Sequence, residues 1–210
     1  MKKHKGYNGW TLRSLWCALL IFLFASQVVN ADNKDPNDPN DPEELLRNKW
    51  DAIVLILQNK DIDQKAKEKE ISKVISPFFD FTLMAKLTLG REHWPKLDEP
   101  QRENFTQLFS ERLKRTYWKK IALYKDENVW FKPTEQKKKI YYIPTELIYK
   151  DKKVSILYKL RKVEKSWKIY DVEIQGVSVL LTYRSQFNEI LSHGTVEDLF
   201  SRLEKPLPND

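Results

Sequence analysis

Few side chains in this sequence could catalyse a reaction, and they are scattered. Outside the first 31 residues the histidines are His93 and His193, which have no metal-ligand spacing and no Gly-x-Ser-x-Gly element nearby. Five glycines in all provide no loop that could hold a phosphate. The adjacent Tyr170 and Asp171 could act as a hydrogen-bond donor and a buried base, but a carboxylate beside basic strands is usually solvated or paired. The sequence therefore favours a protein that is not an enzyme and predicts no metal site and no cofactor, with catalysis by this pair as the alternative.

Apolar side chains are the better candidates for a site, because an acyl chain needs an apolar pocket with few polar groups. Phe105, Phe109, Leu113 and Tyr117 recur at helical spacing and form a stripe. Such a stripe can equally be plain hydrophobic core, so both interpretations stay open at this point. The choice depends on the elements that position these residues.

The first 31 residues have the three-part layout of a secretory signal peptide. A basic start without acidic residues precedes the apolar run 15–24 and the small-residue site Val29-Asn30-Ala31. A transmembrane helix needs about 20 apolar residues, so an uncleaved N-terminal anchor is the less favoured alternative. Cys17 lacks the surroundings of a lipoprotein cleavage site. We expect cleavage near Ala31 and export.

Cleavage would change the charge of the chain and remove its cysteine. The full sequence has 37 Lys+Arg and 30 Asp+Glu, and four of the basic residues lie in the signal peptide, so a net charge of +7 becomes +3. This mild excess argues against a nucleic-acid partner and fits a solvated surface with some preference for anionic membranes. Without Cys17 the mature chain has no disulfide, thiol nucleophile or thiolate metal site, so it tolerates an oxidising compartment.

A spacer is expected at residues 32–42, where the triplet Asp-Pro-Asn occurs at 35–37 and again at 38–40. Repeated prolines and short polar residues cannot bury a core, so we predict disorder there. A calcium-binding acidic loop is the alternative, although the prolines break up the turns that would supply its ligands.

Four amphipathic helices are predicted in the first half of the mature chain, with ranges of about 42–57, 63–78, 81–89 and 98–124. Asp41 is the candidate N-cap of the first. Gly90 is expected to end the third. Asp98 begins the fourth and longest, and Gln101 completes a capping box with it.

Strand signals follow from residue 128, in segments at 129–131, 139–149, 154–163 and 167–174 that are separated by short polar turns. Along the third segment Val154, Ile156, Tyr158 and Leu160 alternate onto one side, which should face helices. Two further helices, about 178–191 and 196–204, close the chain. Helices before and after an antiparallel meander define an α+β domain, in which a curved sheet packed on helices can enclose an apolar cavity.

Two motifs in this sequence resemble the MlaC family, also called the toluene-tolerance auxiliary family of ABC transport systems. The first runs through Phe79-Asp80-Phe81, Met84-Ala85, Leu89-Gly90, Trp94, Gln101-Arg102, Phe105, Phe109, Leu113 and Tyr117. The second is continuous from Trp167 to Ser178 and resumes at Tyr183-Arg184-Ser185-Gln186-Phe187. Together they cover about residues 71–203, in the order of elements that the family shows and behind the expected signal peptide.

The resemblance implies a nuclear-transport-factor-2-like, or cystatin-like, fold with an added helical lobe. It implies a carrier in the periplasm of a Gram-negative bacterium that holds phospholipid, as cargo and not as a cofactor, by its acyl tails. The expected partners are an inner-membrane ABC transporter with an MCE-domain subunit and an outer-membrane lipoprotein complex. Transport between them would maintain the lipid asymmetry of the outer membrane, and a monomer suits such a shuttle. A hopanoid-associated branch of the same superfamily is the alternative.

Lipid contact is predicted for an apolar set on the third and fourth helices, the last strand and the helix after it. The set is Met84, Trp94, Phe105, Phe109, Leu113, Tyr117, Tyr170, Val172, Ile174, Val177, Leu181 and Tyr183. Arg184 is the candidate for the head-group phosphate, with an ion pair to Asp171 as its alternative. Gly176 is expected to permit a tight turn instead of touching lipid. The predicted organisation is a signal peptide 1–31, a spacer 32–42, one domain 43–205 (helices 43–124, sheet 128–174, helices 178–204) and a tail 206–210.

Overall fold

The computed structural model describes residues 41–118, 121, 128–149 and 152–206. All of them belong to one compact unit that spans 36–210. The predicted signal peptide, most of the spacer, the predicted helix end at 122–124 and the last four residues of the tail lie outside the described residues.

Side-chain caps begin the helices where the sequence places them. Asp41 accepts hydrogen bonds from the backbone N–H groups of Glu43 and Glu44, at 2.8 and 3.1 Å, which satisfies donors that have no partner inside the helix. Capping boxes join Asp98 to Gln101 and Thr195 to Asp198. The helices that begin at caps are α1 (Pro42–Gln58), α2 (Gln64–Ile75), α3 (Phe81–His93), α4 (Glu99–Leu113), α6 (Val179–His193) and α7 (Val196–Glu204). Their predicted starts are confirmed.

The third helix is broken at Gly90, where it was predicted to stop, and a further helical turn follows the break. Helix α3 spans Phe81–His93, with a kink at Gly90, whose φ of 65° and ψ of −167° are not helical. A Cβ at this glycine would lie 3.2 Å from a guanidinium nitrogen of Arg184. Glycine is therefore needed here for its left-handed φ and for the close approach of α6. The chain continues into the 3₁₀ turn η2 (Trp94–Lys96).

Helix α4 ends at Leu113 and passes into a π-helical turn, η3 (Lys114–Trp118). The wider turn changes the angular position of the residues that follow it. A similar transition ends α2, which continues as the 3₁₀ turn η1 (Ser76–Phe78) before α3. The described part of the apolar stripe thus has an α-helical portion, with Phe105, Phe109 and Leu113, and a π-helical portion, with Tyr117.

The strands form one antiparallel sheet in the order β1-β3-β4-β5-β6, with β2 also paired to β3. They are β1 (Val129–Phe131), β2 (Glu135–Lys137), β3 (Ile140–Tyr149), β4 (Lys152–Val163), β5 (Ser166–Ile174) and β6 (Val177–Ser178). The short strands β2 and β6 were not predicted, because two or three residues show no alternation. Gln175 and Gly176, with φ of 52° and 76°, form the β5–β6 turn. Gly176 was predicted to permit a tight turn from strand to helix; it does lie in a tight turn, but this turn joins two strands.

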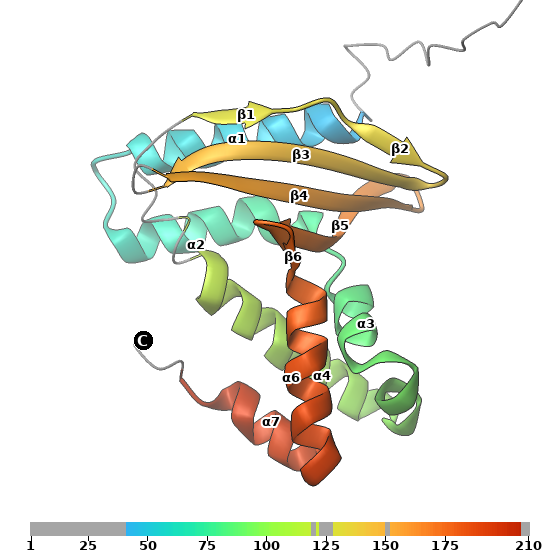
Figure 1. The fold of residues 1–210 in the computed structure, drawn as a ribbon. Helices are drawn as coiled ribbons and strands as arrows, with labels where there is room; N and C mark the ends of the chain where they lie inside the picture. Colours follow the sequence, from blue (N-terminus) through green and yellow to red (C-terminus); the bar gives the residue numbers. More distant parts are fainter. Residues whose placement is uncertain (1–40, 119–120, 122–127, 150–151, 207–210) are drawn as a thin grey trace, which may run out of the picture. The chain divides into compact units, whose positions relative to one another are not determined.

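The buried residues form two clusters. One lies between the sheet and the helices α1 and α2, and the other joins α3, α4, α6 and α7, which gather on the far side of β6 (Figure 1). Phe79, Phe81, Tyr117 and Val172 pack against both clusters. The α+β fold, with a sheet on helices and an added helical lobe, is confirmed.

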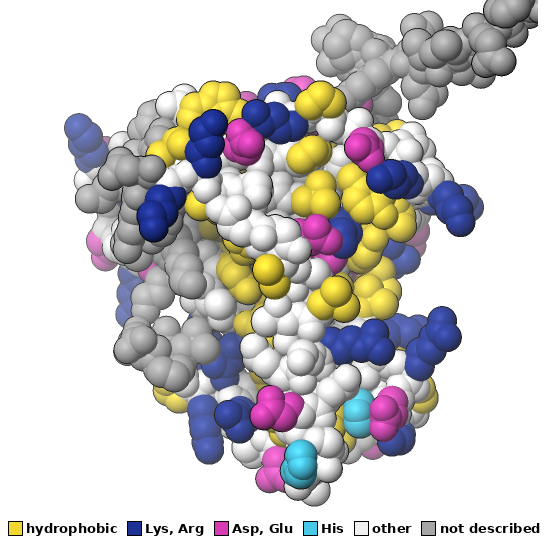
Figure 2. All heavy atoms as spheres, viewed as in Figure 1, with side chains coloured by type: hydrophobic (Ala, Val, Ile, Leu, Met, Phe, Trp, Pro, Cys, Tyr) yellow, Lys and Arg dark blue, Asp and Glu magenta, His cyan; other side chains and the backbone are white. Residues whose placement is uncertain are grey.

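Charged side chains of both signs are interspersed over the face drawn in Figure 2. At the junction of sheet and lobe, Arg161 donates two hydrogen bonds to one oxygen of Asp80, at 3.0 and 2.7 Å. The other Asp80 oxygen accepts from the backbone N–H of Leu83 at 3.0 Å, and so caps α3. This carboxylate therefore fixes the lobe to the sheet.

Candidate functional site

An apolar cavity lies between the concave side of the sheet, α1 and the π-helical turn η3. It has two parts, an outer chamber of about 530 Å³ and an inner chamber of about 100 Å³. The residues that line both are Trp50, Tyr117, Ile121, Tyr158, Ile174 and Val179. Because the chambers share these walls, they adjoin each other and make up one apolar site.

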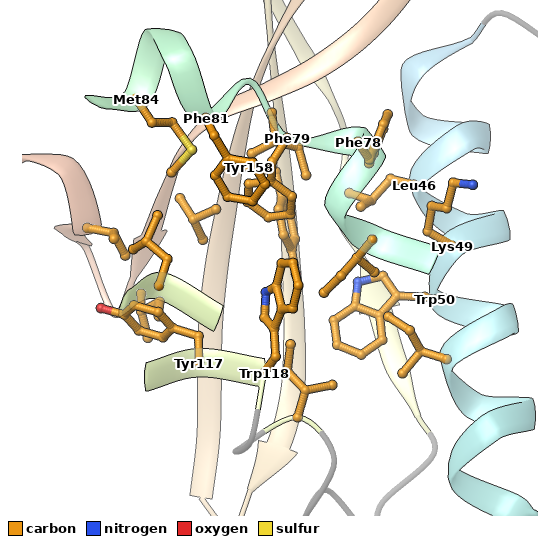
Figure 3. A pocket seen from close by; sticks show the side chains of 18 residues that line it. Leu46, Lys49, Trp50, Phe78, Phe79, Phe81, Met84, Tyr117, Trp118 and Tyr158 are labelled. Carbon is orange, nitrogen blue, oxygen red and sulfur yellow. The ribbon is translucent and has the colours of Figure 1, made fainter. Parts of the chain in front are cut away.

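Each wall comes from a different element. Helix α1 supplies Leu46, Trp50 and Ile53 on one side, and Met84 and Tyr117 face them from α3 and η3 (Figure 3). The inner chamber is closed by aromatic side chains from η1, the start of α3 and η3, namely Phe78, Phe79, Phe81 and Trp118. The outer chamber is walled by the alternating apolar face of β4, namely Val154, Ile156 and Tyr158. Figure 3 shows Lys49 at the edge of this group, beside α1.

The polar atoms of this cavity are few and largely occupied. The hydroxyl of Tyr158 is hydrogen-bonded to the side chains of Trp50 and Thr145. Burial raises the pKa of Tyr158 to about 12, because desolvation disfavours the phenolate more than these hydrogen bonds favour it. Burial, with a smaller effect of Tyr183, likewise raises the pKa of Tyr117 to about 12. Both hydroxyls stay neutral at physiological pH, so the cavity carries no phenolate charge.

The raised pKa of Tyr158 predicts a loss of stability in alkali. Tyr158 titrates near 12 when folded and near 10 when unfolded, so its contribution is complete below pH 10 and is lost as the pH rises through 12. Between these two limits the free energy of unfolding should fall by about 3 kcal/mol through this group. Tyr158→Phe should be less stable by about 1 kcal/mol at neutral pH because it loses hydrogen bonds, and the difference should vanish or reverse above about pH 11.

Urea unfolding at about pH 8 and about pH 11.5 would measure both free energies. Tyr142→Phe is the matched control, since Tyr142 lies on the opposite face of the neighbouring strand. If the free energy of unfolding falls equally between the two pH values for the wild-type protein and for Tyr158→Phe, then Tyr158 is not the group that lowers stability in alkali.

Six of the predicted lipid-contact residues lie on the cavity walls. Met84 and Leu113 line the inner chamber, together with Val172 from β5. Tyr117 and Ile174 line both chambers, and Val177 lines the outer one. The structure therefore brings residues from α3, α4, η3, β5 and β6 to one place, and their contact with lipid remains a prediction.

The other predicted lipid-contact residues lie elsewhere in the structure. Phe105 and Phe109 have no exposed surface and pack with Tyr183 in the core of the helical lobe. Trp94 packs at the edge of that core, where the guanidinium of Arg102 lies 5.6 Å from its ring. For these four residues the structure gives a packing role.

Tyr170 and Leu181 also lie off the cavity walls. At the Lys159/Leu160 register shift, Lys159 pairs with Asp171 and Leu160 with Ile169, so Tyr170 is the extra residue of a β-bulge. Leu181 is exposed on α6. Neither residue lines a chamber wall.

Asp171 has a structural environment. Its carboxylate accepts hydrogen bonds from Ser178, at 3.0 and 2.9 Å to its two oxygens, and from Lys159 at 3.1 Å. The backbone N–H of Leu180 also donates to it, at 3.3 Å. Asp171 thus attaches the start of α6 to the sheet and is not among the cavity residues. The alternative pairing of Arg184 with Asp171 is wrong, because Arg184 lies against Gly90 instead.

The described part of the chain shows neither a metal-binding group nor a membrane-spanning helix. Within it no three His, Cys, Asp or Glu side chains are grouped so that they could hold a metal ion. His193 interacts with Ser192 and His93 lies 4.0 Å from Glu92, so each histidine has a local partner. Among the helices of the same residues, none is both long enough and apolar enough to cross a bilayer.

Sequence reasoning missed half of the cavity. The apolar faces of α1 and β4 were recognised as amphipathic, but the predicted site residues came only from the stretch α3 to η3 and from β5, β6 and α6. Two signals pointed to the missing walls: the tryptophan at position 50 on the α1 face, and the alternating run from Val154 to Leu160. Nothing in the sequence showed that these two faces approach each other around a space.

The fold and the site define an α+β protein with a preformed apolar cavity. The family model for MlaC protein matches residues 47–205, and the chain belongs to the MlaC family. Among solved structures it is similar to the phospholipid-binding protein from Ralstonia solanacearum in complex with a phospholipid. The TM-score is 0.69 and the identity 23%, over 78% of this chain and 95% of that chain. No curated protein matches this sequence. The family resemblance of the two motifs is confirmed.

Proposed function

We propose that this protein is a periplasmic phospholipid carrier that holds acyl chains in the outer chamber. The observation that carries the proposal is the apolar cavity between the sheet, α1 and η3. Its outer chamber of about 530 Å³ lies within the range of about 300–1,000 Å³ for small-molecule sites. The similar Ralstonia protein is in complex with a phospholipid, which supports the same ligand class here.

The chemistry of the walls supports binding by the acyl tails. Each methylene that leaves water contributes about 0.8 kcal/mol, so even part of an acyl chain binds strongly. A phosphate in the outer chamber would lose its hydration without a charged partner among the residues that line it, which is costly. The head group therefore stays at the mouth in water, and the carrier can accept several head groups.

Such a carrier needs partners for loading and release, because strong burial of the tails makes spontaneous release slow. We assign these roles to an inner-membrane ABC transporter with an MCE-domain subunit and to an outer-membrane lipoprotein complex, as the family resemblance implies. Export on a signal peptide cleaved near Ala31 would place the domain between the two membranes. Transport between them would then maintain the lipid asymmetry of the outer membrane.

The test is to fill the outer chamber. Ile156 lines this chamber from β4, whereas the next residue, Leu157, points to the other face of the sheet. Ile156→Trp should reduce the co-purifying phospholipid by at least about tenfold, because the indole occupies the space of the tail. Leu157→Trp is the matched control and should keep its lipid.

Native mass spectrometry of protein expressed from the full sequence would measure the bound lipid directly, and circular dichroism would verify folding. Phospholipid on the wild type and on Leu157→Trp, but not on Ile156→Trp, is the expected result. An empty wild-type protein would overturn the proposal. A hopanoid as the bound species would overturn the assignment to phospholipid.

A further inference from the structure

Three large apolar side chains are exposed where the sheet meets the helical lobe. Val177 on β6 is 60% exposed, Leu181 in the first turns of α6 is 64% exposed, and Leu87 on α3 is 38% exposed. We call these three residues the mouth patch. Figure 2 shows hydrophobic side chains gathered where β6 runs into α6, with basic side chains below them over α3.

The geometry of α3 and α6 brings Leu87 and Leu181 to the same level. Both helices leave the sheet in the same direction, since Asp80 and Ser178 cap their starts next to β5. Gly90 lies beside Arg184. Leu87 and Leu181 precede Gly90 and Arg184 by three positions each, so both lie about one helical turn closer to the sheet. The two leucines therefore lie at the same level on two neighbouring helices.

The mouth patch is continuous with the cavity. Val177 belongs both to the patch and to the wall of the outer chamber, and Thr182, next to Leu181, lines the same wall. An acyl chain that leaves the chamber on this side passes directly over the patch. If that side faced water, each exposed methylene would cost about 0.8 kcal/mol during transfer.

Basic side chains border the patch. Lys86 and Arg91 on α3 and Arg184 on α6 are all exposed. Of the acidic groups nearby, Glu173 forms an ion pair with Lys159, and Glu92 lies next to His93. The margin of the patch is therefore positively charged, which complements an anionic surface.

We infer that the mouth patch docks directly on an anionic bilayer surface, so that lipid tails pass between membrane and chamber without crossing water. This inference rests on the proposed carrier function. A bilayer fits the observations better than a protein surface does. Three exposed apolar side chains with a basic border can insert between lipids without shape complementarity, whereas a stable protein interface needs at least about 1,000 Å² of matched surface.

Vesicle flotation tests the inference, with protein expressed from the full sequence and vesicles of phosphatidylcholine with or without phosphatidylglycerol. Wild-type protein should float with the anionic vesicles and be released by salt. Leu181→Asp should weaken binding at least about tenfold, because it removes apolar contact and adds repulsion. Arg184→Ala should weaken it about fivefold. Leu55→Asp on α1 is the matched control, since Leu55 is 69% exposed and lines neither chamber.

The outcomes separate this inference from the carrier function, because native mass spectrometry reports bound lipid in each variant independently of flotation. Lipid-loaded protein that does not float with anionic vesicles would overturn the docking surface and leave the carrier function intact. Equal losses for Leu55→Asp and Leu181→Asp would also overturn it. If neither the wild type nor any variant binds vesicles, but a reconstituted transporter captures the wild type and not the patch variants, then the patch is a protein-binding surface instead. A wild-type protein without lipid would refute the carrier function itself.

Discussion

Phe105→Ala is expected to lower the free energy of unfolding by about 3–5 kcal/mol while the folded protein keeps its phospholipid. Phe105 has no exposed surface, and its ring lies 5.9 Å from that of Phe109 and 5.6 Å from that of Phe187. Removing the ring leaves a cavity that these close-packed neighbours can fill only in part. The lipid should remain because Phe105 lines neither chamber.

Urea unfolding measures the loss of stability, and native mass spectrometry of the folded variant measures the lipid. Phe200→Ala is the matched control, since its ring is only partly buried and lies 6.2 Å from Phe105 at the edge of the same cluster. It should cost about 1–2 kcal/mol. A stable Phe105→Ala protein that has lost its lipid would show instead that Phe105 belongs to the binding site.

This experiment addresses an ambiguity that the sequence leaves open. Phe105, Phe109, Leu113 and Tyr117 form one apolar stripe, yet the structure divides it. The two phenylalanines fill the lobe core, whereas Leu113 and Tyr117 line the cavity. Helical periodicity reports which side of a helix is apolar, but not whether the opposing surface is packed or hollow. The π-helical turn after Leu113, which changes the direction of Tyr117, has no distinct sequence pattern either.

Local structure was more predictable, because it depends on neighbouring residues. The caps at Asp41, Asp98 and Thr195 each act over two or three residues, and all three helix starts were predicted correctly. The strands β3, β4 and β5 were visible from alternation. Gly90 follows the same local rules: its positive φ interrupts the helix where the sequence predicted an end, and the turn that follows carries α3 on to His93.

A second large effect is expected for Arg112→Ala, which should lower the free energy of unfolding by about 3 kcal/mol. Arg112 is buried in α4, and one guanidinium nitrogen donates to the backbone carbonyls of Arg202, Leu203 and Lys205, at 2.6, 2.9 and 2.8 Å. These carbonyls end α7, where the helix dipole also favours a cation.

Without the guanidinium these carbonyls of α7 lose a donor, and Arg115 still donates only to that of Leu203, at 2.9 Å, so α7 should open before the rest of the domain. Hydrogen exchange of the α7 amides, compared with global unfolding in urea, would detect this. Arg102→Ala is the matched control, because Arg102 lies on the same helix with a partly exposed side chain 3.6 Å from Glu99, and it should cost less than about 1 kcal/mol. If Arg112→Ala costs no more than the control, then water replaces the guanidinium at the end of α7, and the packing of Leu199 and Leu203 holds the helix in place.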